Sequence, residues 1–165
     1  MANFTLRLHV YQAKDIPTTN PVGLASAYVQ VLFYGKSAKT KHVKWSNSPT
    51  WDTTLTLSKI ELPCLGWPGN TDLDEEEEDD DKKYNHKHEG GREKWEENYN
   101  MLRFAKRIEV QVLEKGQNPK LLGRCYIAPE ECLHTQDDPD WHELYLGNPE
   151  QDEGRIYLCA QMLHE

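Results

Sequence analysis

Hydrophobic and polar residues alternate in short runs along most of the chain, and turn-forming residues separate these runs. In the first run, residues 4–11, the side chains of Phe4, Leu6, Leu8 and Val10 fall on one face of an extended chain. Alternation with a period of two, in runs rich in β-branched and aromatic residues, is typical of strands that bury one face. The pattern predicts eight strands, over residues 4–11, 28–34, 39–44, 52–57, 107–113, 121–127, 141–146 and 155–162.

The connections between these runs favour an antiparallel arrangement. Pro17, Asn20, Pro21 and Gly23 interrupt the chain between the first two runs, and little helical periodicity separates the others. Short strands joined by turns pack as two sheets, each with one buried face. We therefore expect an all-β, eight-stranded antiparallel β-sandwich that forms a single domain over residues 4–163.

A segment of different composition, residues 63–106, separates the fourth and fifth predicted strands. Its acidic run from Asp74 to Asp81 has nothing to bury and repels itself, so we expect this insertion to be partly disordered. Trp95, Tyr99 and Leu102 have helical spacing and predict a short helix near residues 92–103. The insertion is either a solvated loop whose helix packs on the sandwich, or a partner site or electrostatic brake.

The charge is concentrated in this insertion. The chain has a formal net charge of −9, and residues 72–97 alone contain 13 acidic and 5 basic residues. The remainder is close to neutral, without the basic excess that nucleic-acid binding requires. We therefore expect no nucleic-acid partner.

Sequence patterns of enzymes and metal sites are missing. The chain contains no GxSxG, P-loop, HExxH or GxGxxG pattern. His86 and His88 flank Lys87 in the insertion, without a third ligand at a fixed position. The cysteines have no CxxC spacing and are expected to be free thiols in a reducing compartment: Cys64, Cys125, Cys132 and Cys159. We expect no catalytic residues, no cofactor and no metal.

Several segments together resemble C2 domains. Residues 6–16 resemble the first strand and loop of that family, and residues 26–31 stand where it carries Ser-Asp-Pro-Tyr-Val-x-Val. Lys39-Thr40 with residues 47–52 resembles its Lys-Thr and Asn-Pro-x-Trp-Asn/Asp pattern, and residues 121–123 resemble its Leu-Gly step. The resemblance covers the chain from Phe4 to about Leu163, apart from the insertion.

Three stretches are similar to the central C2 domains of the ferlin family: residues 11–15, 49–55 and 122–125. The strand order resembles the permuted topology that the C2 family calls type II. Ferlins are tail-anchored proteins that act in vesicle fusion and membrane repair. The resemblance therefore implies one module of such a protein, at the cytoplasmic face of membranes, whose transmembrane anchor lies outside this chain.

The type II order implies that the loops after the first, third and fifth strands meet at one end, called the tip here, with the insertion at the other. By resemblance, the calcium ligands of C2 domains would lie at the tip on the first and third of these loops. This chain has Asn20 and Ser26 in place of loop-1 aspartates, and Glu114-Lys115-Gly116 in place of an Asp-x-Asp pair. Calcium takes about 6–8 oxygen ligands, so we predict no tight calcium binding.

Lysines near the third strand offer another way to bind membranes. Lys36, Lys39, Lys41 and Lys44 cluster where many C2 domains have a basic, lipid-contacting face, and Val22 and Leu24 on the first loop could enter the interface. Each lysine near an anionic leaflet adds about 1 kcal/mol, which predicts weak, salt-sensitive attachment. The same residues are equally compatible with an ordinary solvated strand.

Two functions remain open. The chain is either a calcium-independent module that binds anionic phospholipid weakly, or an interaction module that contacts neighbouring domains or a protein partner without lipid. The acidic insertion opposes membrane attachment unless it points away from the leaflet, and it could also cover the lysine face. Dependence on Lys39, Lys41 and salt would distinguish the two functions.

Overall fold

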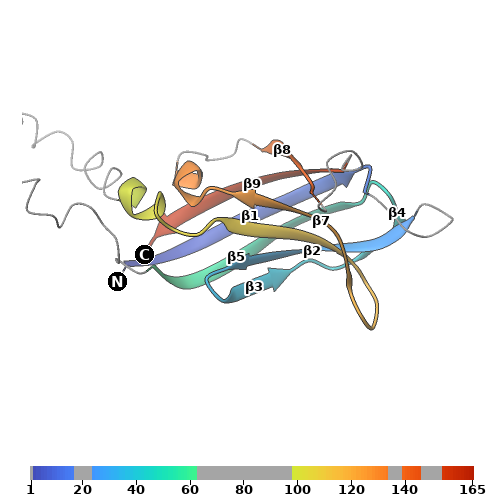
Figure 1. The fold of residues 1–165 in the computed structure, drawn as a ribbon, viewed down its shortest axis with the longest axis horizontal. Coiled ribbons are helices and arrows are strands. Elements are labelled where there is room, and N and C mark those ends of the chain that lie inside the picture. The colour runs from blue at the N-terminus through green and yellow to red at the C-terminus, as the bar shows by residue number, and fades with distance from the viewer. Residues whose placement is uncertain (1, 17–23, 63–97, 134–138, 146–153) are drawn as a thin grey trace, which may run out of the picture.

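The computed structural model describes residues 2–16, 24–62, 98–133, 139–145 and 154–165. Within these ranges the chain forms nine strands and one 3-10 helix (Figure 1). The strands are β1 (Ala2–Lys14), β2 (Ala25–Phe33), β3 (Lys36–Lys39), β4 (Val43–Ser46), β5 (Thr50–Leu62), β6 (Ile108–Glu114), β7 (Lys120–Ile127), β8 (Asp140–Glu143) and β9 (Arg155–His164). The 3-10 helix η3 spans Pro129–Leu133, and residues 98–102 are α-helical.

The strands form two antiparallel sheets. One sheet has the order β5-β1-β9-β8, and the other has the order β3-β2-β6-β7 with β4 also paired to β2. The last strand, β9, lies beside β1 over almost its whole length, from Phe4 opposite His164 to Lys14 opposite Arg155. This is the all-β sandwich expected from the sequence, with the C-terminal strand in the place that the type II order gives it.

The core lies between the two sheets. Phe4, Leu6, Leu8 and Val10 of β1 are all 0% exposed, as the alternating pattern predicts. Valines of β2 and β6 cover them from the opposite sheet, and β5, β7 and β9 add further apolar residues to one buried cluster. Removing this apolar surface from water stabilises the sandwich and fixes the register of its strands.

The third strand predicted over residues 39–44 is divided in the structure into β3 and β4, which gives nine described strands instead of eight. Thr40, 7% exposed, causes the break. Its backbone N–H donates to Val29 O at 2.8 Å. Its side chain takes over the pairing of Val29, because Oγ1 accepts from Val29 N–H at 3.0 Å and donates to Lys41 O at 2.9 Å. A side-chain bond of this kind replaces a ladder bond and allows the backbone to turn.

The tip loops meet as predicted. Ile16 N–H donates to Asn47 O at 3.0 Å, which joins the connections after β1 and β4. Lys115 N–H donates to Ser26 O at 2.8 Å, which holds the connection after β6 to the start of β2. The predicted insertion begins at the opposite end, where Leu62 pairs with Ala2. Leu102, the last residue of the described helical turn, is fully buried there. Residues 63–97, including the acidic run, His86, His88 and Trp95, lie outside the described residues.

Candidate functional site

An open groove of about 600 Å³ lies at the tip, between β2, the β3–β4 segment and the loop after β6. Four of the described residues that line it are lysines, and none is acidic. The lining residues are Tyr28, Lys39, Thr40, Lys41, His42, Lys44, Lys115, Gly116 and Pro119. Three of the four lysines are those predicted from the sequence, and we call this feature the lysine groove.

Thr40 sets the positions of the first two lysines. Because its side chain is buried against β2, the neighbouring side chains of Lys39 and Lys41 both project outward, and both are exposed. The Nζ of Lys39 lies 5.9 Å from the centre of the Tyr28 ring, within the range of a cation–π contact. The two ammonium groups are therefore presented on the same side of the chain, although only Lys39 belongs to a strand.

The other two lysines come from the neighbouring strand and from the tip loop. Lys44 lies in β4, and Lys115 follows the last residue of β6. The hydrogen bond from Lys115 N–H to Ser26 O holds this loop against β2. From the sequence, Lys115 was considered only within the Glu114-Lys115-Gly116 stretch and was not placed with the lysine cluster. Its contribution arises from the convergence of the loops.

The groove has a positive electrostatic environment. The pKa of His42 is lowered, first because the imidazole is partly removed from water, and then because Lys115 and Lys44 repel its protonated form. The same repulsion acts between the lysines themselves. An anion that enters the groove relieves it, and phosphate oxygens are suitable acceptors for several ammonium groups.

The remaining lipid-binding candidates are placed differently. Lys36 does not line the groove; its Nζ donates to Ser58 O on β5 at 2.6 Å. Leu24 is half-buried directly before β2. Val22 lies outside the described residues.

Of the four positions that correspond to calcium ligands in C2 domains, Ser26, Glu114 and Gly116 are described, and Asn20 lies outside the described residues. Ser26 uses its carbonyl to accept from Lys115, and its Oγ accepts from Trp45 N–H at 3.4 Å. Glu114 is the last residue of β6, opposite Ala27 and Lys120, and Gly116 lines the lysine groove. Within the described ranges, no group of three or more His, Cys, Asp or Glu residues could hold a metal ion.

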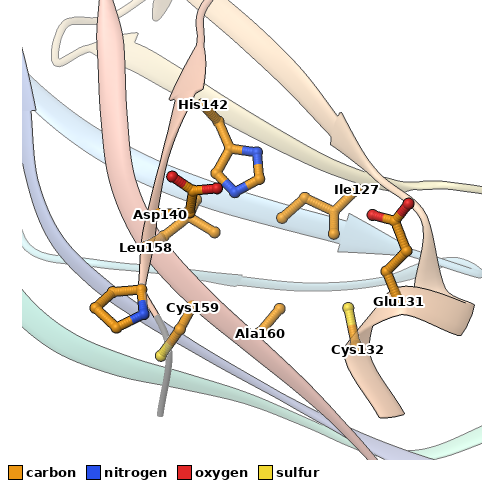
Figure 2. A pocket seen from close by; sticks show the side chains of 9 residues that line it. Ile127, Glu131, Cys132, Asp140, His142, Leu158, Cys159 and Ala160 are labelled. Carbon is orange, nitrogen blue, oxygen red and sulfur yellow. The ribbon is translucent and has the colours of Figure 1, made fainter. Parts of the chain in front are cut away.

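A second pocket, of about 280 Å³, lies between η3, β8 and β9 (Figure 2). Ile127, Leu158 and Ala160 line it together with two carboxylates, Glu131 and Asp140. Its other lining residues are Cys132, Pro139, His142 and Cys159, and we call it the acidic pocket.

The acidic pocket is poorly suited to nucleophilic chemistry. Burial, assisted by the nearby Glu131 and Glu130, raises the pKa of Cys132 to about 12. Its thiol also donates to Ala128 O at 3.6 Å. A protonated, buried thiol is a weak nucleophile. The pKa of His142 is lowered by burial, against the opposing effect of Asp140 and Glu131.

Comparisons with known proteins agree with this fold. Residues 4–74 match the family model of the C2 domain. A chain with the SMP, C2A and C2B domains of Extended-Synaptotagmin 2 superposes with a TM-score of 0.62 at 14% identity, covering 99% of this chain and 28% of that one. The C2A domain of plant Extended Synaptotagmin 1 superposes with a TM-score of 0.60 at 13% identity, covering 100% of this chain and 98% of that one.

An enzyme is also among the structural neighbours. Human GIVD cytosolic phospholipase A2 superposes with a TM-score of 0.58 at 11% identity, covering 99% of this chain but 17% of the enzyme. The chain thus spans less than a third of the length of this enzyme and of the first synaptotagmin chain. Within the described part of the chain, no helix is long and apolar enough to cross a membrane. The match over residues 4–74, the strand order and the structural neighbours show that the described sandwich has the fold of C2 domains.

Proposed function

We propose that this C2 domain is a non-catalytic module that binds anionic phospholipid membranes weakly and without calcium, through the lysine groove. The observation that carries the proposal is the convergence of Lys39, Lys41, Lys44 and Lys115 on one open groove at the tip, without an acidic lining residue among those described. Lysines at an anionic leaflet each contribute about 1 kcal/mol, so four of them support reversible, salt-dependent attachment.

Calcium independence is supported by the chemistry of the tip. Among the described positions that correspond to calcium ligands, only Glu114 has a carboxylate, and Lys115 follows it directly. One carboxylate beside an ammonium group cannot fill the coordination shell of calcium. The sequence similarity to ferlins supports a place in a tail-anchored protein of membrane fusion or repair, at the cytoplasmic face of the membrane.

Sedimentation with vesicles tests the proposal. Lys39 and Lys41 are both replaced by Gln, and the matched control carries Lys106→Gln with Arg107→Gln, two exposed cations near the start of β6. We expect wild-type binding to vesicles with 30% phosphatidylserine, equal with calcium and with chelator. The groove variant should lose about 10–30-fold in partitioning, because two attractions of about 1 kcal/mol are removed. The control should change little.

Salt and calorimetry complete the test. Raising NaCl from 50 to 500 mM shortens the Debye length severalfold and should release the wild-type protein. Heat from a tight calcium site would contradict calcium independence. If the wild-type protein does not bind anionic vesicles at low salt, the alternative of an interaction module without lipid binding replaces this proposal.

A further inference from the structure

Strand β4 contains a bulge at the edge of the lysine groove. Ala25 pairs with Ser46 and Ala27 pairs with Val43, so the single residue Ser26 of β2 lies opposite Lys44 and Trp45. An extra residue in one strand breaks the alternation of side chains and can re-aim them. Both Lys44 and Trp45 are exposed as a result, although neighbouring residues of a regular strand point to opposite faces.

The bulge leaves the Trp45 side chain exposed to water and its backbone in a strained conformation. Trp45 is 64% exposed, the largest exposed fraction among the large hydrophobic side chains of the described residues. Its backbone has a φ of 50°, in the left-handed region that bulky residues rarely adopt. A hydrogen bond from Trp45 N–H to Ser26 Oγ supports this conformation. Within the described ranges, no other ring or cation stacks on the indole.

We propose that Trp45 is an interfacial anchor that enters the headgroup region of an anionic phospholipid leaflet while the lysine groove binds the phosphates. This inference rests on the proposed function and adds a residue and an orientation to it. Indole has an apolar body and one N–H donor, a combination that favours the boundary between headgroups and acyl chains. Lys44, the preceding residue, lines the groove, so the anchor and the cationic surface are continuous.

The positive charge of the groove next to Trp45 favours an anionic membrane surface as the ligand. The groove offers four ammonium groups, which suit a surface of many phosphates and carboxylates, and Trp45 adds an apolar contact that a soluble anion would not use. Contact through Trp45 and the groove sets an orientation. β4 faces the leaflet, and the two termini and the helical turn at residues 98–102 lie at the far end of the sandwich (Figure 1).

Two variants and a fluorescence measurement test the anchor. Trp45→Ala is compared with Phe104→Ala, which removes another exposed aromatic residue (52%) from the opposite end. We expect Trp45→Ala to weaken partitioning into vesicles with 30% phosphatidylserine about tenfold, because it removes the apolar part of the contact. Phe104→Ala should bind like the wild type. Circular dichroism and thermal unfolding of both variants confirm that they are folded.

Fluorescence locates the indole directly. With vesicles that contain lipids brominated near the headgroup end of the acyl chains, wild-type tryptophan emission should be quenched on binding. Trp45→Phe, which retains an aromatic ring, should bind and lose most of that quenching. Equal quenching in both proteins, or equal partitioning of Trp45→Ala and wild type, would overturn the anchor while leaving groove binding intact. Failure of the wild-type protein to bind vesicles would instead overturn the proposed function itself.

Discussion

The lysine groove and the acidic pocket show how one sandwich builds two hollows of opposite charge. The groove is lined by four lysines on the strand edges and tip loop of the β3-β2-β6-β7 sheet. The pocket, at η3 and strands β8 and β9 of the other sheet, contains two carboxylates and two thiols together with apolar residues. The groove is about twice as large. The sign of the charge, more than the shape, determines which of the two can face an anionic leaflet.

The two hollows also differ in how their side chains are held. The lysine groove depends on a few specific polar bonds, above all those of Thr40, which connect otherwise exposed segments to β2. The acidic pocket lies against core residues such as Leu158, and its Cys132 is almost fully buried. A change in local polar bonding should therefore affect the groove first, whereas the pocket should respond to conditions that ionise buried groups.

The largest expected effect concerns Thr40. Thr40→Val keeps the shape but leaves the buried Val29 N–H without its acceptor, which costs about 1–3 kcal/mol of unfolding free energy. Vesicle binding should also fall, because Lys39 and Lys41 lose the bonded residue between them. Urea denaturation measures the first effect and sedimentation the second. Thr40→Ser retains the hydroxyl and should stay close to wild type. An unchanged urea midpoint for Thr40→Val would disprove the role assigned to this side chain.

The second largest effect is a pH dependence of stability that arises from Cys132 in the acidic pocket. Burial raises the pKa of Cys132 from an ordinary value of 9.0 to about 12. The folded state therefore holds this proton more tightly than the unfolded state. Its contribution to stability is complete below pH 9 and is lost as the pH rises towards 12. By pH 11 the free energy of unfolding of the wild type should have fallen by about 2–3 kcal/mol more than that of a Cys132→Ala variant. Equal slopes from pH 8 to 11 in urea unfolding would contradict this.

The smallest expected effect tests whether the position of a charge or the total charge governs binding. Glu131→Gln with Asp140→Gln removes two negative charges from the acidic pocket. If the groove alone contacts the leaflet, partitioning into anionic vesicles should rise less than about twofold at 150 mM salt, where screening is strong beyond about 8 Å. An increase as large as the decrease expected for the Lys39 and Lys41 double variant would show that net charge governs attachment, and the contrast between the hollows would lose its functional meaning.

Much of the fold follows from local pattern. The alternation of Phe4, Leu6, Leu8 and Val10 predicted a strand with one buried face, because burial in a sandwich has the same period as the pleat. The closeness of Lys39, Lys41 and Lys44 was visible for a similar reason, since they are near neighbours in the sequence. Features that depend only on residues close together in the sequence could therefore be predicted without the structure.

The features that the sequence alone did not reveal depend on partners that are distant along the chain. The break at Thr40 requires Val29, and the bulge at Trp45 requires Ser26, so neither leaves a local signal. Lys115 joins the groove only because its loop is bonded to β2. The acidic pocket likewise combines residues from η3, β8 and β9, whose closeness is a property of the sheet order.

The pairing of β9 with β1 has a mechanical consequence. The two strands end together, with Phe4 opposite His164, and Glu165 N–H donates to Asn3 O at 2.9 Å. A force applied to the two termini would pull these neighbouring antiparallel strands apart from one end, so their bonds would break one after another like a zipper. Strands loaded in shear would share the load across many bonds at once. The sandwich should therefore peel open at modest tension, starting from the end farthest from the lysine groove.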